Sequence, residues 1–391
     1  MNLNETEVKH KLPLNEEWID SQALKLVKKL QSNNHTTYLV GGCVRDLLIG
    51  LPPKDFDIST SATPEEVNKI IRPSYIIGRR FQLVLVKRFG EQYEISTFRS
   101  QGEKTNDEDT GGLILDDNVF GTPEEDAKRR DFTINSFFYD PVSQELYDYC
   151  NGLNDIEMRV VRMIGDPIVR IQEDPLRMLR AVRFAHKSNF AIEESLRDAI
   201  TKLADHLQYT VLPRKREELL KFLRLKTASS LIWELHDLNL LKHLSPTLDD
   251  ALTNQDGDLF TMNLNRGLEC VSDHSNPNEL FSVLLYSLIT SRYPDFCETL
   301  HLKDDQIESL SQILKDEWGM FRNEQELFFQ TLKFIKTLQG IKNTQKMRDR
   351  YKTHLLKSNS MVTALTLCSA YRLLPEPDLY FWANQYWNFR R

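Results

Sequence analysis

Two aspartates stand one residue apart in the stretch KDFDIST, residues 54–60. Alternate side chains of an extended strand point to the same face, so Asp55 and Asp57 are expected to share one space while Phe56 points into the core. Carboxylates that share a space repel each other unless a divalent cation lies between them, and oxygen ligands of this kind suit Mg²⁺ held partly by substrate phosphates. The pair predicts a metal site for phosphoryl chemistry, although Asp-x-Asp also occurs by chance, as at residues 107–109.

Gly41 and Gly42 come directly after a predicted strand at residues 36–40 and before a predicted helix. Glycines at such a point let a triphosphate approach the backbone, and the dipole of the helix favours negative charge there. Arg45 lies in the first helical turn, where its guanidinium can grip phosphate oxygens in a fixed fork. The structural alternative is a surface ion pair between Arg45 and Asp46.

A third carboxylate, Glu94, lies in the second of two predicted strands, residues 81–88 and 93–98, which are joined by a turn at residues 89–90. If this strand lies beside the strand of Asp57, the acidic side chains form one triad. The alternative is a solvent-facing glutamate on an edge strand.

The stretch GTPEEDAKRRDFTIN, residues 121–135, opens with a helix signal in which Thr122 is the N-cap and Pro123 the first helical residue. Arg130 could bind phosphate or ribose, and Asp131 could help to hold the catalytic carboxylates or the sugar. The structural alternative makes the arginine a favourable cation near a helix end and the aspartate a local cap.

The stretch EDPLRMLRAVRF, residues 173–184, predicts a helix that begins near Asp174 and has one apolar face. Asp174 and Arg177 are neighbours on the other face, with Arg180 one turn further. A carboxylate can accept from an exocyclic amino group while a guanidinium donates to the adjacent ring nitrogen, a pattern that fits adenine and cytosine and rejects guanine and uracil. The alternative is an ordinary acid–base pair near a helix start.

The elements that must position these side chains are of two kinds. Strand and helix signals alternate in the first part of the 391 residues, and beyond about residue 165 the apolar periodicity is helical. We therefore expect an α+β protein with three domains: residues 1–150, a head domain of α/β type; residues 151–245, a helical neck; and residues 246–391, a helical body and tail.

Composition narrows the class of protein. With 40% hydrophobic and 27% charged residues the chain is expected to be globular, and it shows neither a signal peptide nor an apolar run long enough for a bilayer. We expect a cytoplasmic protein with no membrane partner. The five cysteines are scattered and are expected to be reduced. A net charge of −7 excludes bulk coating of nucleic acid and leaves room for a local basic groove.

Taken together, LVGGCVRDLLIG, KDFDIST, ISTFR, RRDFTIN and EDPLRMLRAVRF resemble, in order and spacing, the head and neck motifs of the class II tRNA nucleotidyltransferase and poly(A) polymerase family. The resemblance implies a polymerase β-like nucleotidyltransferase head followed by an all-helical neck, body and tail. It also implies two Mg²⁺ ions, ATP and an RNA 3′ end as substrates, and the following roles: Asp55 and Asp57 for metal; Gly41, Gly42, Arg45 and Arg130 for nucleotide; Asp174, Arg177 and Arg180 for base and triphosphate; Glu94 or Asp131 as a further catalytic carboxylate.

The family contains enzymes that append AMP repeatedly and enzymes that rebuild the CCA end of tRNA. An aspartate–arginine template fits both A and C. The stretch YIIGRRFQLVLV, residues 75–86, resembles the poly(A) branch, so we expect polyadenylation, with CCA addition as the alternative. The basic cluster in LPRKREELLKFL, residues 212–223, is compatible with RNA contacts, and the alternative is a solvated helix face. A non-catalytic RNA-binding protein on the same scaffold is the remote alternative.

Overall fold

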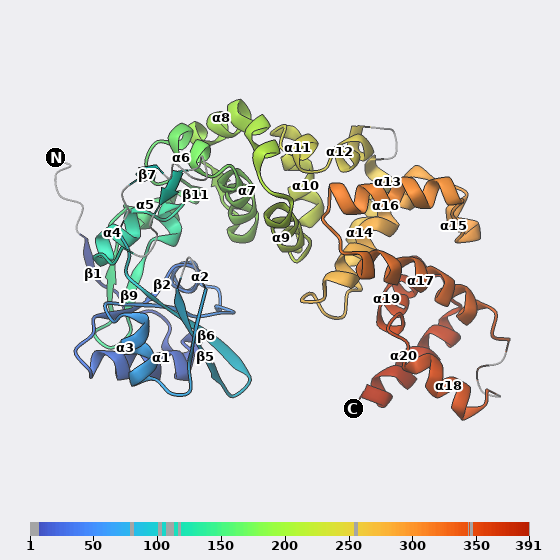
Figure 1. Cartoon of the computed structure of the whole chain (residues 1–391), viewed down its shortest axis with the longest axis horizontal. Helices are drawn as coiled ribbons and strands as arrows, with labels where there is room; N and C mark the ends of the chain where they lie inside the picture. Colours follow the sequence, from blue (N-terminus) through green and yellow to red (C-terminus); the bar gives the residue numbers. More distant parts are fainter. Residues whose placement is uncertain are drawn as a thin grey trace. The chain divides into compact units, whose positions relative to one another are not determined.

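The computed structural model describes residues 8–78, 82–100, 104–106, 113–115, 119–253, 257–342, 344 and 347–390. The chain divides into two compact units, Met1–Arg170 with Ser188–Arg197 and Ile171–Lys187 with Asp198–Arg391. Figure 1 shows strands and helices in the first unit and helices in the second, so the expected α+β class is confirmed. The three-domain division with boundaries at residues 150 and 245 stays a prediction.

A mixed sheet of eight strands forms the centre of the first unit. In spatial order its strands are β1 (Lys9–Lys11), β10 (Glu145–Tyr147), β9 (Phe138–Asp140), β2 (Thr37–Val40), β3 (Asp57–Thr60), β6 (Glu91–Thr97), β5 (Leu83–Arg88) and β4 (Tyr75–Ile77). Among the described strands of this sheet, β3 and β6 pair in parallel and the other neighbours pair antiparallel. The turn predicted between β5 and β6 is confirmed, with positive φ at Phe89 (51°) and Gly90 (90°).

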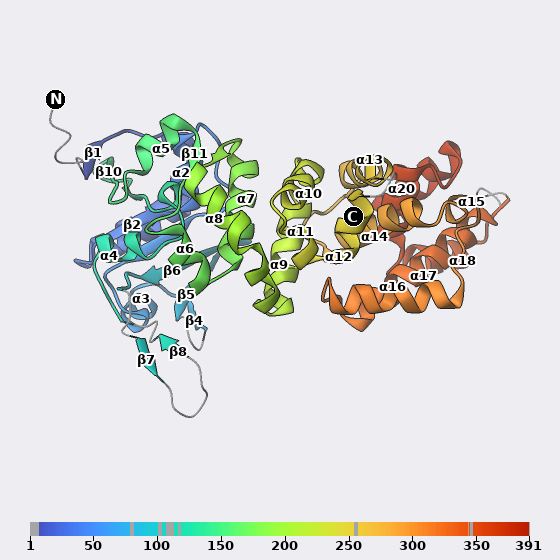
Figure 2. The same cartoon turned by 90° about the horizontal axis from the view of Figure 1, so that it is seen from above.

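Short helices connect and cover the strands of the first unit: α1 (Ser21–Gln31), α2 (Gly42–Leu48), α3 (Pro64–Ile70), α4 (Pro123–Lys128) and α5 (Gly152–Met158), with the 3₁₀ helices η1 (Glu16–Trp18) and η2 (Thr133–Asn135). The pairs β7 (Lys104–Asn106) with β8 (Leu113–Leu115) and β11 (Val160–Val161) with β12 (Ala191–Ile192) lie outside the sheet, and β7–β8 projects away from it in Figure 2. The buried apolar side of α1 packs with the core-facing residues of β2, β3, β5 and β6, because its apolar residues recur at helical spacing.

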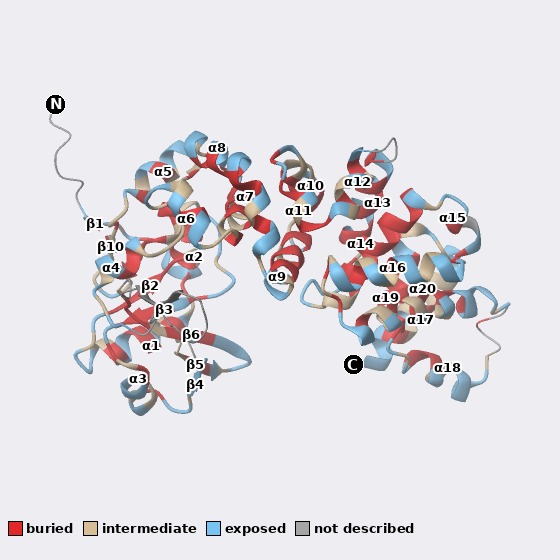
Figure 3. Ribbon diagram, turned by 45° about the horizontal axis from the view of Figure 1, so that its top comes forward, coloured by how far each residue is buried: buried red, intermediate tan, exposed pale blue. Residues whose placement is uncertain are grey.

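From residue 167 onward the described chain is helical apart from β12. The helices are α6 (Pro167–Glu173), α7 (Leu176–Ser188), α8 (Glu194–Leu203), η3 (Ala204–Tyr209), α9 (Leu212–Leu223), α10 (Ala228–Asp237), α11 (Leu241–Leu244), α12 (Pro246–Thr253), α13 (Gly257–Glu269), α14 (Pro277–Arg292), α15 (Phe296–Thr299), α16 (Asp304–Asp316), α17 (Arg322–Gln339), α18 (Asp349–Leu356), α19 (Met361–Tyr371) and α20 (Glu376–Arg390). Helix α14 is buried along most of its length, as Figure 3 shows, and packs against α13, α17 and α19.

Within the described residues, no helix combines the length and the hydrophobicity that a membrane span requires. The cytoplasmic location expected from the sequence stays a prediction.

Candidate active site

The parallel pair β3–β6 places two carboxylates side by side. Asp57 is the first residue of β3 and lies opposite Glu94 of β6 in the register of the pair. Both side chains reach solvent, whereas the following residues Ile58 and Ile95 are buried on the opposite face. The strand of Glu94 therefore lies beside the strand of Asp57, as the triad required. The edge-strand alternative is wrong, since β6 lies between β3 and β5.

The local electrostatic field at Asp57 is unfavourable for its own charge. The pKa of Asp57 is raised to about 6, first by desolvation and then by the negative charges of Glu94 and Asp55, while the charge of Arg130 lowers it. Solvent reaches this carboxyl group although protein atoms crowd it. A divalent cation would relieve this repulsion, because carboxylates held this close favour either a proton or a metal. The donor set therefore fits a hard cation.

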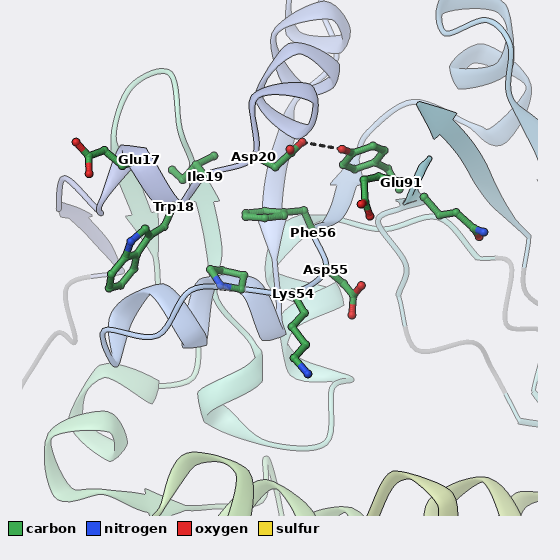
Figure 4. A pocket seen from close by; sticks show the side chains of 11 residues that line it. Glu17, Trp18, Ile19, Asp20, Lys54, Asp55, Phe56 and Glu91 are labelled. Carbon is green, nitrogen blue, oxygen red and sulfur yellow. Dashed lines mark hydrogen bonds between the residues drawn. The ribbon is translucent and has the colours of Figure 1, made fainter. Parts of the chain in front are cut away.

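Asp55 precedes β3 and is exposed. With Lys54 and Phe56 it lines a cavity of about 330 Å³ that also includes η1 and the start of β6. Figure 4 shows the carboxyl group of Asp55 and the ring of Phe56 pointing in different directions, and Phe56 is buried in the core as predicted. Within the described residues, no group of three or more His, Cys, Asp or Glu side chains is arranged to hold a metal ion. An ion at Asp55 and Asp57 would need further oxygens from a substrate.

The glycine pair lies where the sequence predicted a close approach. Gly41 has a positive φ of 70°, and a Cβ added to it would lie 2.9 Å from Nη1 of Arg130. Gly42 begins α2. A side chain at residue 41 would therefore collide with Arg130 and require a strained backbone conformation.

Arg45 is in the buried interior of the first unit, with its side chain only 1% exposed. Its Nε and Nη2 donate to Oδ1 of Asp46 at 2.9 and 2.5 Å, and its Nη1 donates to Oδ1 of Asn135 at 2.5 Å. The pair with Asp46 exists, but it is buried and is not the surface pair of the structural alternative. A phosphate contact by Arg45 stays a prediction.

Arg130 follows α4, whose N-cap Thr122 and first residue Pro123 are as predicted. Its side chain is partly exposed and lies with its guanidinium carbon 5.2 Å from the centre of the Phe138 ring. Nη1 donates to the main-chain oxygen of Asn135 at 3.2 Å. Arg130 is thus a fixed cation whose charge acts on Asp57.

Asp131 is half-buried, and its main-chain oxygen accepts from the N–H of Ile164 at 3.1 Å. This main-chain bond ties the residue to the segment after β11. Its predicted catalytic role is not decided by these contacts.

Sequence reasoning missed two residues that hold the arginines. Asp126 is 1% exposed and accepts from Nε of Arg129 at 2.7 Å and from Nη2 of Arg130 at 3.1 Å. Asn135 accepts from Arg45 through its side chain and from Arg130 through its main chain. The spacing of four between Asp126 and Arg130 was a usable signal, because such pairs face each other on a helix.

The predicted base-selecting residues lie in the second unit. Helix α7 begins at Leu176, and its residues Met178, Ala181, Val182 and Ala185 are buried, as the periodicity predicted. Oδ1 of Asp174 accepts from the N–H of Leu176 at 3.3 Å.

Asp174, Arg177 and Arg180 each have a charged partner. Nη1 of Arg177 donates to Oε2 of Glu173 at 2.9 Å. Oδ2 of Asp174 accepts from Nη2 of Arg214 at 2.8 Å, and Nη2 of Arg180 lies 3.8 Å from the same oxygen. Sequence reasoning did not single out Glu173 or Arg214.

Two family models match the chain. Residues 37–162 match the model of the Poly A polymerase head domain. The first unit carries a poly A polymerase head domain. Residues 189–252 match a model described as the probable RNA and SrmB-binding site of polymerase A. The head domain contains the glycine pair, both aspartates, Glu94 and the arginine segment.

Relatives of two kinds are similar to this chain. Poly(A) polymerase I of Salmonella typhi is 42% identical over 246 residues, which is 61% of this chain and 53% of the relative. A CCA-adding enzyme of Staphylococcus saprophyticus is 35% identical over 199 residues, 51% of this chain and 49% of the relative. The chain thus spans about half the length of the curated relatives it matches.

A solved structure shares the fold. The Bacillus stearothermophilus CCA-adding enzyme in complex with CTP superposes with a TM-score of 0.64 at 24% identity, over 94% of this chain and 82% of that chain. The nucleotidyltransferase head followed by helices, expected from the motifs, is therefore confirmed as the fold. The stretch that resembled the poly(A) branch includes residues 79–81, which lie outside the described residues.

Proposed function

We propose that this chain is a template-independent RNA nucleotidyltransferase that adds AMP from ATP to RNA 3′ ends. One observation carries the proposal: Asp57 lies opposite Glu94 in parallel register, and desolvation together with the negative charges of Glu94 and Asp55 raises the pKa of Asp57 to about 6. A bound cation would offset the repulsion between these carboxylates and favour the ionised form of Asp57. The similarity to poly(A) polymerase I supports AMP as the unit added.

Asp55 and Asp57 are the residues that would hold two Mg²⁺ ions. Such ions, when bound, lower the pKa of an attacking hydroxyl and neutralise charge on a triphosphate during in-line displacement. The protein groups prepare the site for this chemistry. The negative charge of Glu94 makes the electrostatic potential at Asp57 more negative. Asp57 and Glu94 are exposed to solvent, so substrate oxygens could approach them.

The triphosphate would lie against the glycine pair and Arg130. Gly41 and Gly42 carry no side chains that would keep phosphate oxygens from the backbone where α2 begins, and the side chain of Arg130, beside Gly41, reaches solvent whereas that of Arg45 is buried. Arg45 is proposed to contribute to nucleotide binding from the same segment as the glycines. In the structure its guanidinium donates to Asp46 and Asn135. Asp131 is proposed to assist at the sugar or the carboxylates.

The base would be selected by α7. The carboxylate of Asp174 would accept from the adenine amino group, Arg177 would donate to the ring nitrogen, and Arg180 would contribute to binding base and triphosphate. Support comes from the partial exposure of Arg177 and Arg180 on α7 and of Asp174 just before it, whereas the apolar residues of the helix are buried.

CCA addition to tRNA is the second candidate. It is favoured by the similarity to a CCA-adding enzyme at 35% identity and by a template that accepts both A and C. The RNA partner in that case would be tRNA. A non-catalytic RNA-binding protein is disfavoured, because a scaffold without catalysis has no need of clustered repelling carboxylates.

Parallel incorporation assays test these functions. The purified chain is incubated with Mg²⁺ and labelled ATP on oligo(A), and with labelled CTP on tRNA that lacks its terminal CCA. Long AMP additions to oligo(A) with no defined short CTP addition are the expected result. CTP incorporation that stops after a short addition would favour CCA addition over polyadenylation. No incorporation in either assay would favour a non-catalytic RNA-binding protein.

A further inference from the structure

Helix α9 presents two charged side chains to the residues of α7. Arg214, which is 49% exposed, donates through Nη2 to Oδ2 of Asp174 at 2.8 Å. Four residues later, Glu218 lies with Oε1 4.0 Å from Nε of Arg180. Since residues four apart lie on one face of a helix, a cation and an anion of α9 face an anion just before α7 and a cation within α7.

Glu218 is the buried member of this set, with a side chain only 3% exposed. Its Oε2 accepts from Nε of Arg183 at 2.9 Å, and its Oε1 accepts from Nζ of Lys221 at 2.9 Å. Desolvation acts to raise the pKa of Glu218, but the charges of Arg183 and Lys221 outweigh it and hold the pKa below its ordinary value. Glu218 is therefore a permanent anion between cations of α7 and its own helix.

Arg180 connects the two halves of the arrangement. Its Nη2 lies 3.8 Å from Oδ2 of Asp174, and its Nε lies 4.0 Å from Glu218. The charges alternate in the order Arg214, Asp174, Arg180, Glu218. A shift of any one of these groups changes the field on its neighbours, because the charges of a partly buried network are coupled.

We propose that Arg214 and Glu218 are positioning residues that set the orientation of Asp174 and Arg180 and thereby determine which base is accepted. The proposal rests on the proposed role of α7 in base selection. Glu218 is buried and negative, so it acts through the arginines rather than on a triphosphate. Arg214 fixes Oδ2 of Asp174, while Oδ1, which accepts from the N–H of Leu176, keeps a second lone pair for a base amino group.

The test compares isosteric and matched variants. Glu218→Gln removes the charge at nearly constant shape, Arg214→Met removes the donor and keeps the stem, and Glu218→Asp keeps the charge. The control is Glu217→Gln, because Glu217 is the neighbouring residue, is 58% exposed and pairs with Arg216. Equilibrium binding of ATP and of GTP is measured for each variant, together with the melting temperature and kcat/KM on one RNA primer.

Glu218→Gln and Arg214→Met are expected to reduce the ratio of ATP to GTP affinity by roughly five- to tenfold, which is less than the loss of a charged hydrogen bond to the base itself, because both residues act through Asp174 and Arg180. Glu218→Asp should restore most of the ratio, and Glu217→Gln should leave it unchanged. A merely structural role would lower the melting temperature and weaken both nucleotides by the same factor. That result, or a ratio equal to that of Glu217→Gln, overturns the proposal.

Asp174→Asn in the same series separates the two levels of inference. If Asp174→Asn leaves the ATP to GTP ratio unchanged, the base-selecting role of α7 is wrong, and the positioning role falls with it. If Asp174→Asn changes the ratio while Glu218→Gln and Arg214→Met do not, only the positioning role is wrong. Nucleotide binding is measured without turnover, so the binding ratio tests the positioning role even if the incorporation assay shows no activity. A failure of the proposed function and a failure of the positioning role can therefore be distinguished.

Discussion

The acidic site of the head domain and the charged contact between α7 and α9 shift the pKa values of their carboxyl groups in opposite directions. Asp57 has other carboxylates as neighbours, and its pKa is raised to about 6. Glu218 is desolvated too, but Arg183 and Lys221 hold its pKa below the ordinary value. Desolvation acts in the same direction on both, so the sign of the neighbouring charge decides the outcome.

This difference is the one expected between a ligand-binding site and a structural network of ion pairs. At Asp57 the protein leaves a repulsion that a ligand can relieve, which is a feature of functional sites. At Glu218 the protein supplies its own counter-charges, which is the arrangement of a fixed support. If this interpretation is correct, substitutions at the first region remove chemistry, and substitutions at the second change selectivity.

The largest effect is expected at Asp55 and Asp57, the two aspartates proposed to bind metal. Asp55→Ala and Asp57→Ala should each reduce Mg²⁺-dependent AMP addition to less than roughly a tenth of wild type while leaving the fold intact. The measurement is labelled ATP incorporation beside a melting curve. Glu65→Gln, at an exposed acid in the first turn of α3, is the control and should keep full activity. A variant that retains most of its turnover would remove that aspartate from the metal-ligand role.

Arg45→Ala should cost about 3–5 kcal/mol of unfolding free energy, because it leaves the buried carboxylate of Asp46 without this cation. Urea unfolding checks the value. Lys128→Ala serves as the contrast, since Lys128 pairs with Glu124 at the surface with both side chains more than half exposed; its loss should cost less than about 1 kcal/mol. Equal stability of the two variants would mean that Asp46 finds solvent or a new partner.

Arg177→Ala should lower efficiency with ATP by roughly ten- to a hundredfold, corresponding to about 1.5–3 kcal/mol for one charged hydrogen bond. It should also relax the rejection of GTP and UTP, because the donor that opposes their ring N–H disappears. Steady-state kinetics with four nucleotides on one primer measure the pattern. An equal loss for every nucleotide would make Arg177 a phosphate or structural residue.

The smallest effect is a pH dependence at Asp57. Its pKa is raised from 3.8 to about 6, so without metal its contribution to stability is fully present below pH 3.8 and is lost as the pH rises through about 6. Asp57→Asn should therefore be as stable as wild type or more stable at pH 7, and the advantage should shrink in acid. Apparent Mg²⁺ affinity of wild type should fall below about pH 6, where a proton competes. Thermal melts and Mg²⁺ titrations across this range decide both points, and an affinity that is flat with pH would contradict them.

Local signals predicted much of the head and one helix of the second unit correctly. In the head, the strand before Gly41, the turn at Phe89 and Gly90 and the helix cap at Thr122 follow from patterns within a few residues, and so does the apolar face of α7 in the second unit. The fold class and the motif-based head domain could therefore be reached without coordinates.

The remaining features depend on contacts distant in sequence. From the sequence, Asp57 and Glu94 could be placed together only if their strands were neighbours, and no local pattern determines which strands pair. The burial of Arg45 depends on Asn135, 90 residues away. Glu218 looked like any acid on a solvated helix, and only contacts with side chains distant in sequence, such as Arg183 of α7, make it an interior anion.

The parallel pairing of β3 with β6 also has a consequence for the order of folding. The hairpin β5–β6 joins neighbouring segments, whereas residue 57 meets residue 94 only after the intervening chain, including α3 and β4, has been accommodated. Closing such a loop costs entropy that local contacts do not repay. The cation site would thus be absent from a chain that has formed only its hairpins. Mg²⁺ would then stabilise the finished head by mass action and leave partly folded states unchanged, which would make divalent cation a selective ligand of the completed fold.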